Sequence, residues 1–117
     1  MFDGVWRSQA GAELRLLQMG EAVSGTYTAA NPGIAQTSRS RILVGTAEGD
    51  IIGFVTSTSS PQEITAWTGR LVRADEKTAE EIHAVFHAVE RCSQPKAVDS
   101  HIALETTIFS KVENAFS

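Results

Sequence analysis

Ser24-Gly25-Thr26-Tyr27 and Ala66-Trp67-Thr68-Gly69 are the stretches of this chain that decide its fold, together with Gly4-Val5-Trp6 near its start. Each lies within or beside a short run in which apolar and polar residues alternate. Alternation with a period of two is typical of a β-strand with one face in a core. The chain is therefore expected to be an all-β protein.

Similar runs recur along the chain, separated by turn-forming Gly, Pro, Asn, Asp or Ser residues. With 117 residues the chain fits one domain, and closing its sheet would remove both exposed edges without a second layer. We therefore expect residues 1–117 to form a single domain, an eight-stranded antiparallel up-and-down β-barrel. The predicted strands are 4–9, 13–19, 22–30, 39–47, 50–58, 62–73, 80–91 and 99–112.

Residues 78–91 also fit a helix. Ile82, Val85, Phe86 and Val89 follow the spacing of an amphipathic helix, and Thr78 with Glu81 resembles a capping box. Read as a strand, the same segment places Ile82 and Phe86 on one face and Val85 and Val89 on the other. We predict the strand, because of the family resemblance described below.

Composition excludes several classes of function. The net charge is −4 and no basic stripe is present, so nucleic acid is not an expected partner. Arg39 and Arg41 form the densest basic spot and are predicted to be exposed residues that aid solubility.

No apolar stretch approaches the roughly 20 residues that cross a bilayer. Cys92 is the only cysteine, which rules out an internal disulfide. The start shows no secretory signal as written, so a cytoplasmic protein and a secreted one without its leader fit equally well.

The three stretches, followed by the ending Thr106-Thr107-Ile108-Phe109-Ser110-Lys111-Val112, resemble the avidin and streptavidin family. The resemblance spans nearly the whole chain and rests on the order and spacing of several short motifs. It implies a closed barrel that holds one small ligand at its open end. By the same resemblance, Trp6, Phe54 and Phe109 would pack in the barrel floor.

The resemblance also implies ligand contacts. Tyr27 is similar to the family's tyrosine that directs its hydroxyl at the ureido oxygen of biotin. Trp67 is similar to a tryptophan of the pocket wall, and Thr65 to a threonine that bonds the sulfur of biotin.

Several positions depart from the family pattern. Two alanines stand where hydroxyl residues are expected, a threonine and a phenylalanine replace pocket tryptophans, and a threonine replaces a carboxylate or amide. The changed positions are Ser8, Ala12, Ala29, Thr58, Phe86, Asp99 and Thr107. Each lost contact of this kind costs about 2–4 kcal/mol of binding free energy. Biotin binding is therefore expected to be absent or much weakened.

We expect a non-enzymatic barrel that binds a small molecule in its mouth, without metal or cofactor. Glu105 shares a face with Thr107 and would either bind a polar or cationic group or lie at the rim in water. The predicted ligand-binding residues are Ser8, Tyr27, Thr58, Thr65, Trp67, Phe86, Glu105 and Thr107.

Two alternatives remain. Tyr27 and Glu105 could act as a general acid–base pair on a bound substrate. The chain could also be an oligomeric interaction module, because Val85 and His87 would project outside the barrel beside Ile102 and Leu104. A homodimer or homotetramer is the expected assembly. His83 and His87 are expected to be surface or interface residues, with Cys92 and His101 further metal-ligand candidates by type only.

Overall fold

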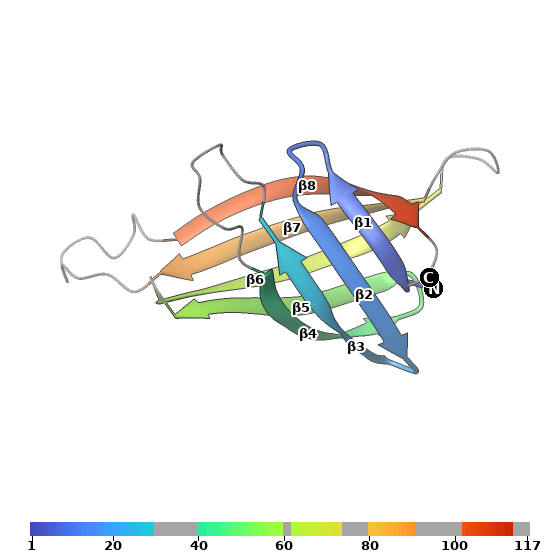
Figure 1. Cartoon of the computed structure of the whole chain (residues 1–117), viewed down its shortest axis with the longest axis horizontal. Helices are drawn as coiled ribbons and strands as arrows, with labels where there is room; N and C mark the ends of the chain where they lie inside the picture. The colour runs from blue at the N-terminus through green and yellow to red at the C-terminus, as the bar shows by residue number, and fades with distance from the viewer. Residues whose placement is uncertain (30–39, 60–61, 74–79, 91–101, 114–117) are drawn as a thin grey trace.

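The computed structural model describes residues 1–29, 40–59, 62–73, 80–90 and 102–113. Its eight strands form one closed barrel in which each strand pairs with the next and β8 pairs with β1, all antiparallel (Figure 1). This confirms the predicted fold. The strands are β1 (Gly4–Ser8), β2 (Glu13–Met19), β3 (Ala22–Thr28), β4 (Ser40–Glu48), β5 (Ile51–Ser59), β6 (Gln62–Val72), β7 (Glu81–Glu90) and β8 (Ile102–Glu113).

The predicted boundaries agree with these strands to within two residues at most ends. The largest difference is at β8, which begins at Ile102 instead of residue 99. Residues 99–101 lie outside the described part of the chain. No helix long and apolar enough to span a membrane occurs among the described residues.

The segment with two possible structures is the strand β7, as predicted. It pairs with β6 from Glu81 to Glu90 and with β8 from Glu81 to Val89. Ile82 points into the barrel, whereas Val85 and Val89 are on the outside and 43% and 48% exposed. The helical spacing therefore arises because this strand carries apolar residues on both faces.

Tight turns join the strands at the end of the barrel near the N-terminus. Met19 pairs with Ala22, and Glu48 pairs with Ile51, so each hairpin has a two-residue loop. Gly20 and Gly49 occupy the first position of these loops with φ values of 62° and 58°. A positive φ at this position suits the twist of the flanking strands, and glycine adopts it without the steric cost of a Cβ atom.

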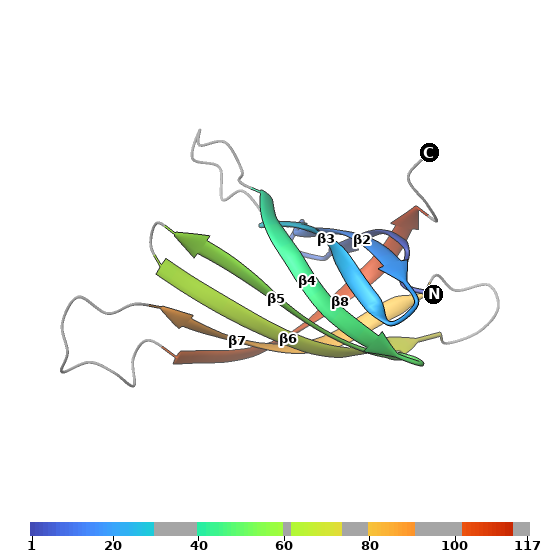
Figure 2. The same cartoon turned by 90° about the horizontal axis from the view of Figure 1, so that it is seen from below.

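The N-terminal segment lies at the same end of the barrel (Figure 2). Phe2 and Trp6 are completely buried, and the Trp6 indole N–H donates to the Phe2 carbonyl oxygen at 2.9 Å. The Phe2 N–H donates to the Gln18 side chain at 3.0 Å, and the Gln18 N–H donates to Asp3 at 2.9 Å. These bonds hold the segment across this end of the barrel.

Side chains alternate between the barrel interior and the outside along most of the strands. In β1 the alternation is interrupted, because Val5 and Trp6 are both buried where the register with β8 shifts. The interior is filled by apolar groups drawn from all eight strands and from the N-terminal segment. The buried apolar cluster contains Phe2, Trp6, Ala12, Leu14, Leu16, Val23, Leu43, Ala47, Ile52, Phe54, Trp67, Ile82, Ala84 and Phe109.

A close approach between β4 and β5 requires glycine at position 45. A Cβ atom placed on Gly45 would lie 2.0 Å from the carbonyl oxygen of Gly53 and 2.6 Å from the Cα and Cβ atoms of Phe54. These atoms belong to the backbone and the base of a side chain, so rotation of a side chain cannot relieve the overlap.

We predict that Gly45→Ala lowers the melting temperature by about 10 °C or more, because β5 must move to admit the methyl group. Gly53→Ala is the matched control, since its Cβ atom would meet only Trp67 O at 3.6 Å and Thr68 Cγ2 at 3.8 Å. Thermal unfolding followed by circular dichroism at equal protein concentration tests the pair. Equal melting temperatures for the two variants would contradict the close approach.

Candidate functional site

A cavity of about 290 Å³ lies in the barrel, toward the end opposite the N-terminal segment. We call it the mouth cavity. Its walls come from residues near the start, the middle and the end of the sequence. Closure of the barrel brings these residues together. The described lining is Ser8, Ala10, Ala12, Tyr27, Trp67, Phe86, Glu105, Thr106, Thr107 and Phe109.

Trp67 on β6 is the centre of the cavity wall. Its ring contacts Phe86 at a centroid distance of 4.5 Å, Phe54 at 5.5 Å with nearly parallel planes, and Phe109 at 5.9 Å. Phe54 and Phe109 therefore form the layer directly beneath the cavity, consistent with their predicted place in the floor. The Trp67 indole N–H points to the Thr56 hydroxyl oxygen at 3.4 Å, a long hydrogen bond.

Tyr27 on β3 forms a second aromatic wall, and its ring lies 5.1 Å from that of Trp67. The guanidinium carbon of Arg41 lies 5.8 Å from the centre of the Tyr27 ring on another side, within the range of a cation–π contact. Burial raises the pKa of the Tyr27 phenol; nearby Arg41 opposes this shift and Glu63 adds to it. The hydroxyl is therefore neutral near pH 7 and can donate a hydrogen bond.

Ser8 and Thr107 bring hydroxyl groups to the opposite side of the cavity. Ser8 is buried, and its Oγ accepts a hydrogen bond from the Ala12 N–H at 3.0 Å. The Ser8 hydroxyl thus has its own hydrogen left to donate. Thr107 is partly buried, whereas Glu105 is exposed, in keeping with a place at the rim in water.

Thr65 and Thr58 are placed differently from the other predicted site residues. Thr65 is buried and pairs with Thr56 across β5 and β6, and Thr58 is partly buried beside Glu63 in the same register. Neither belongs to the described lining of the mouth cavity. The cavity therefore brings together six of the eight predicted residues: Ser8, Tyr27, Trp67, Phe86, Glu105 and Thr107.

An ion pair near the mouth was missed by the sequence reasoning. Arg41 on β4 donates to Glu63 on β6 at 3.3 Å, and both side chains are about three-quarters buried, with exposed fractions of 26% and 22%. The prediction that Arg41 is simply an exposed surface residue is therefore wrong. Its strand alternation could have shown this, because Arg41 shares a face with the buried Leu43.

Histidines do not form a metal centre in the described part of the chain. No group of three or more potential ligands comes together there. His83 is exposed and bonds to Glu81 at 2.9 Å on the outside of β7. Cys92 and His101, the other candidates by type, lie outside the described residues.

Solved structures share this fold at low sequence identity. Xenavidin is 21% identical with a TM-score of 0.80, and the match covers 95% of this chain and 97% of that one. A biotin complex of a shwanavidin variant is 21% identical with a TM-score of 0.75, covering 96% of this chain and 98% of that one. The biotin-binding protein from chicken is 18% identical with a TM-score of 0.76, covering 94% of each chain.

Sequence comparison identifies the family. No curated protein matches the chain. The family model described as the Avidin family, however, matches residues 1–112, which is nearly the whole chain. With its closed eight-stranded barrel and its aromatic mouth cavity, this protein belongs to the avidin family.

Proposed function

We propose that the protein binds a small molecule in the mouth cavity, between the aromatic wall of Trp67 and the hydroxyl groups of Ser8, Tyr27 and Thr107. The observation that carries this proposal is the grouping of Tyr27 and Phe86 around Trp67 beside a cavity of about 290 Å³. A mostly apolar cavity with a few convergent polar groups is the usual form of a ligand site. This volume is at the lower end of the usual range, so the ligand is small.

The cavity is suited to a ligand with a carbonyl-like oxygen. Tyr27 and Ser8 are both donors, and the raised pKa of Tyr27 keeps its proton in place at neutral pH. The Trp67 and Phe86 rings offer flat apolar surfaces for the rest of the ligand. The ligand we propose therefore has a flat apolar body and one strong hydrogen-bond acceptor.

Biotin itself is proposed to bind weakly or not at all. Ala12 lines the cavity without a hydroxyl group, and Thr107 stands where the family often has a carboxylate or amide. Phe86 stands in the place of a pocket tryptophan, and Thr58, in the place of another, is not in the described lining. Four losses of about 2–4 kcal/mol each would weaken binding by roughly six orders of magnitude or more.

We predict that biotin binds with a dissociation constant of about 1 μM or weaker, measured by isothermal titration calorimetry. Ala12→Ser and Thr107→Asp restore polar groups of the family pattern, and each should tighten biotin binding by about 10-fold or more. Thr68→Ser, on the outer face beside Trp67, is the control and should leave the constant unchanged. A sub-nanomolar constant for the unaltered protein would contradict weakened biotin binding.

Tyr27 is the only tyrosine in the chain, so its ionisation can be followed by tyrosinate absorbance. We predict a midpoint above the ordinary value of about 10. Arg41→Gln should raise the midpoint further, and Glu63→Gln should lower it, because these are the charges that act on Tyr27. The stability that Tyr27 contributes through this shift is complete below pH 10 and is lost as pH rises through the folded-state pKa.

The titration has an internal control. In denaturant the midpoint of each variant should return to the ordinary value, since the burial and the charges are then lost. A midpoint at or below the ordinary value in the folded protein would show that Tyr27 is open to water and does not belong to a buried donor site.

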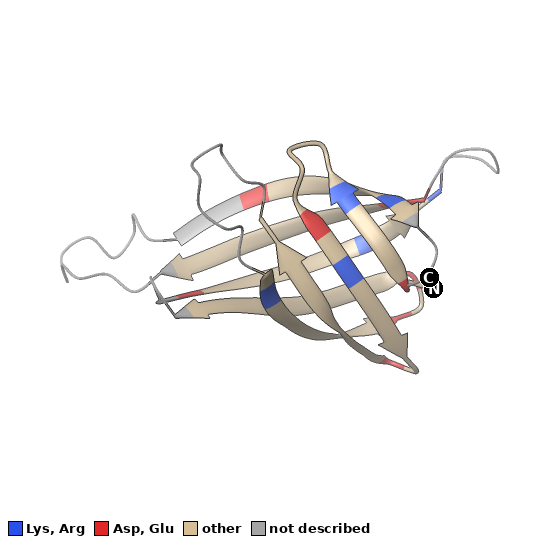
Figure 3. Ribbon diagram, viewed as in Figure 1, with Lys and Arg blue, Asp and Glu red and all other residues tan. Residues whose placement is uncertain are grey.

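We also propose that a second copy of the chain covers the outer face of β4–β7. Charged residues of β4 and β6 lie near the strand ends, leaving the middle of this face uncharged (Figure 3). Val44 and Val55 pair across β4 and β5, while Ile64 and Val89 pair across β6 and β7. Their exposed fractions are 53%, 42%, 57% and 48%, and nearby Ile42 is 77% exposed. A continuous exposed apolar face of this kind is typical of a subunit interface.

The sequence also places Ile102 and Leu104 of β8 beside Val85 on the outside of the barrel. The side chains of Ile102 and Leu104 are not among those that the structure describes.

Val55→Glu is predicted to shift the protein toward monomer, because it buries a charge at the centre of that face. Leu17→Glu is the matched control, since Leu17 on β2 is 44% exposed but lies opposite Ser24, away from the apolar face. Sedimentation velocity over a dilution series measures both. An unaltered protein that is monomeric at micromolar concentration would overturn this assembly.

A further inference from the structure

The seam between β1 and β8 is incomplete in the described structure. β7 pairs with β8 from Ile102 to Ser110, whereas β1 pairs with β8 only from Phe109 onward. The first half of β8 therefore has a strand neighbour on one side only, among the residues that the structure describes.

The reason is the turn that follows β1. Ser8 lies opposite Phe109 and Arg7 opposite Ser110, so a longer β1 would place Gly11 opposite Thr106. The chain instead turns at residues 9–10, and the Gly11 N–H donates to the Ser8 carbonyl oxygen at 3.0 Å. β1 thus leaves β8 before reaching Thr106.

The direction of the β8 backbone groups follows from one hydrogen bond. The Lys111 N–H donates to the Glu80 carbonyl oxygen at 2.9 Å, on the β7 side. Backbone groups of successive strand residues point to opposite sides. Thr107, like Lys111, therefore directs its N–H and C=O toward β7, whereas Thr106 and Ile108 direct theirs toward the gap beyond β1.

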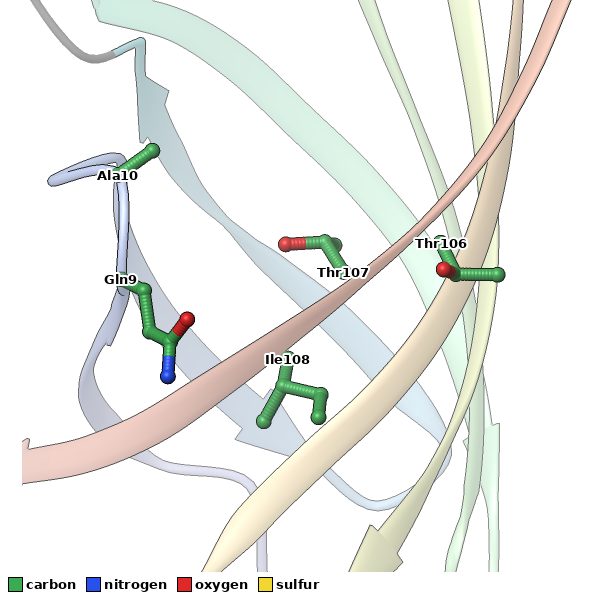
Figure 4. A pocket seen from close by; sticks show the side chains of 5 residues that line it. All are labelled: Gln9, Ala10, Thr106, Thr107 and Ile108. Atoms are coloured by element: carbon green, nitrogen blue, oxygen red, sulfur yellow. The ribbon is translucent and has the colours of Figure 1, made fainter.

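This gap is a cavity of about 360 Å³, which we call the seam notch. Figure 4 shows Gln9 and Ala10 on one side of it and Thr106, Thr107 and Ile108 along β8 on the other. Its described lining carries no charge: it consists of the Gln9 amide, two threonine hydroxyls, and the apolar Ala10 and Ile108. Ala10, Thr106 and Thr107 also line the mouth cavity, so the two sites adjoin.

We propose that the seam notch is a second binding site, and that it takes one residue of an extended peptide as an added β-strand pair with Thr106. An amino-acid residue in extended conformation presents its own N–H and C=O on the same side. These two groups match the C=O and N–H of Thr106, which face the notch. Addition of an extended chain to an open strand edge is an established mode of peptide recognition. The uncharged lining suits a neutral backbone, and Ile108 and Ala10 suit an apolar side chain.

This proposal does not depend on what the mouth cavity binds. The smallest probe that contains the required pair of groups is an acylated amino-acid amide, N-acetylvalinamide. Its titration into ¹⁵N-labelled full-length protein should give saturable shifts of the Thr106 and Ile108 amide signals. Hydrogen exchange at the Thr106 amide, which the probe's C=O accepts from, should slow, while the Thr107 amide, which faces β7, keeps its exchange rate.

One analogue of the probe and three protein variants make the test specific. The analogue with an ester oxygen in place of the acyl N–H lacks the donor and should bind at least about 10-fold more weakly. Gln9→Trp should fill the notch and abolish the shifts, whereas Gln9→Ala, the milder change, should weaken binding. Thr68→Ala, on the outer face of β6, should leave probe binding unchanged.

Other results would overturn the proposal. Shifts centred on the Trp67 indole N–H would place the probe in the mouth cavity, which rejects the notch site and leaves the proposed function intact. Equal binding of the amide and the ester would reject pairing with Thr106. The absence of saturable shifts at the solubility limit of the probe would reject the site altogether.

Discussion

The packing of Trp67 is the contact on which the interior of this barrel depends. Its ring touches side chains from the neighbouring strands β5 and β7 and from β3 and β8 across the barrel. Below it, Phe54 and Phe109 join the buried floor that ends at Trp6 and Phe2. Above it, Tyr27 and Phe86 border the mouth cavity. The same indole therefore separates the packed half of the barrel from the half that is open to a ligand.

Much of the fold could be predicted from the sequence because alternation is a local property. Most of the strands show it, and the motifs around Trp6, Tyr27 and Trp67 supplied the order of the strands. Segment 78–91 was ambiguous for a physical reason. β7 has Val85 and Val89 on its outer face, so its apolar residues fit both periods, and only pairing with β6 and β8 decides between them.

The candidate site was less predictable, since it depends on contacts between distant strands. The charge of Arg41 predicts a surface position, but its partner Glu63 lies two strands away, and the ion pair becomes evident only when the barrel is formed. Thr65 has the inward direction that alternation predicts, but it lies among buried neighbours and is absent from the described cavity lining. The seam notch could not be predicted at all, because it arises from the point at which the short strand β1 turns away from β8.

The central claim is that a small molecule occupies the mouth cavity, against the aromatic wall formed by Tyr27, Trp67 and Phe86. Native mass spectrometry of the protein, purified gently from its own cells, tests this most directly. The account predicts an added mass that is released on denaturation and is lost or reduced in Trp67→Ala protein that remains folded. A ligand retained equally by the unaltered protein and by folded Trp67→Ala would contradict it.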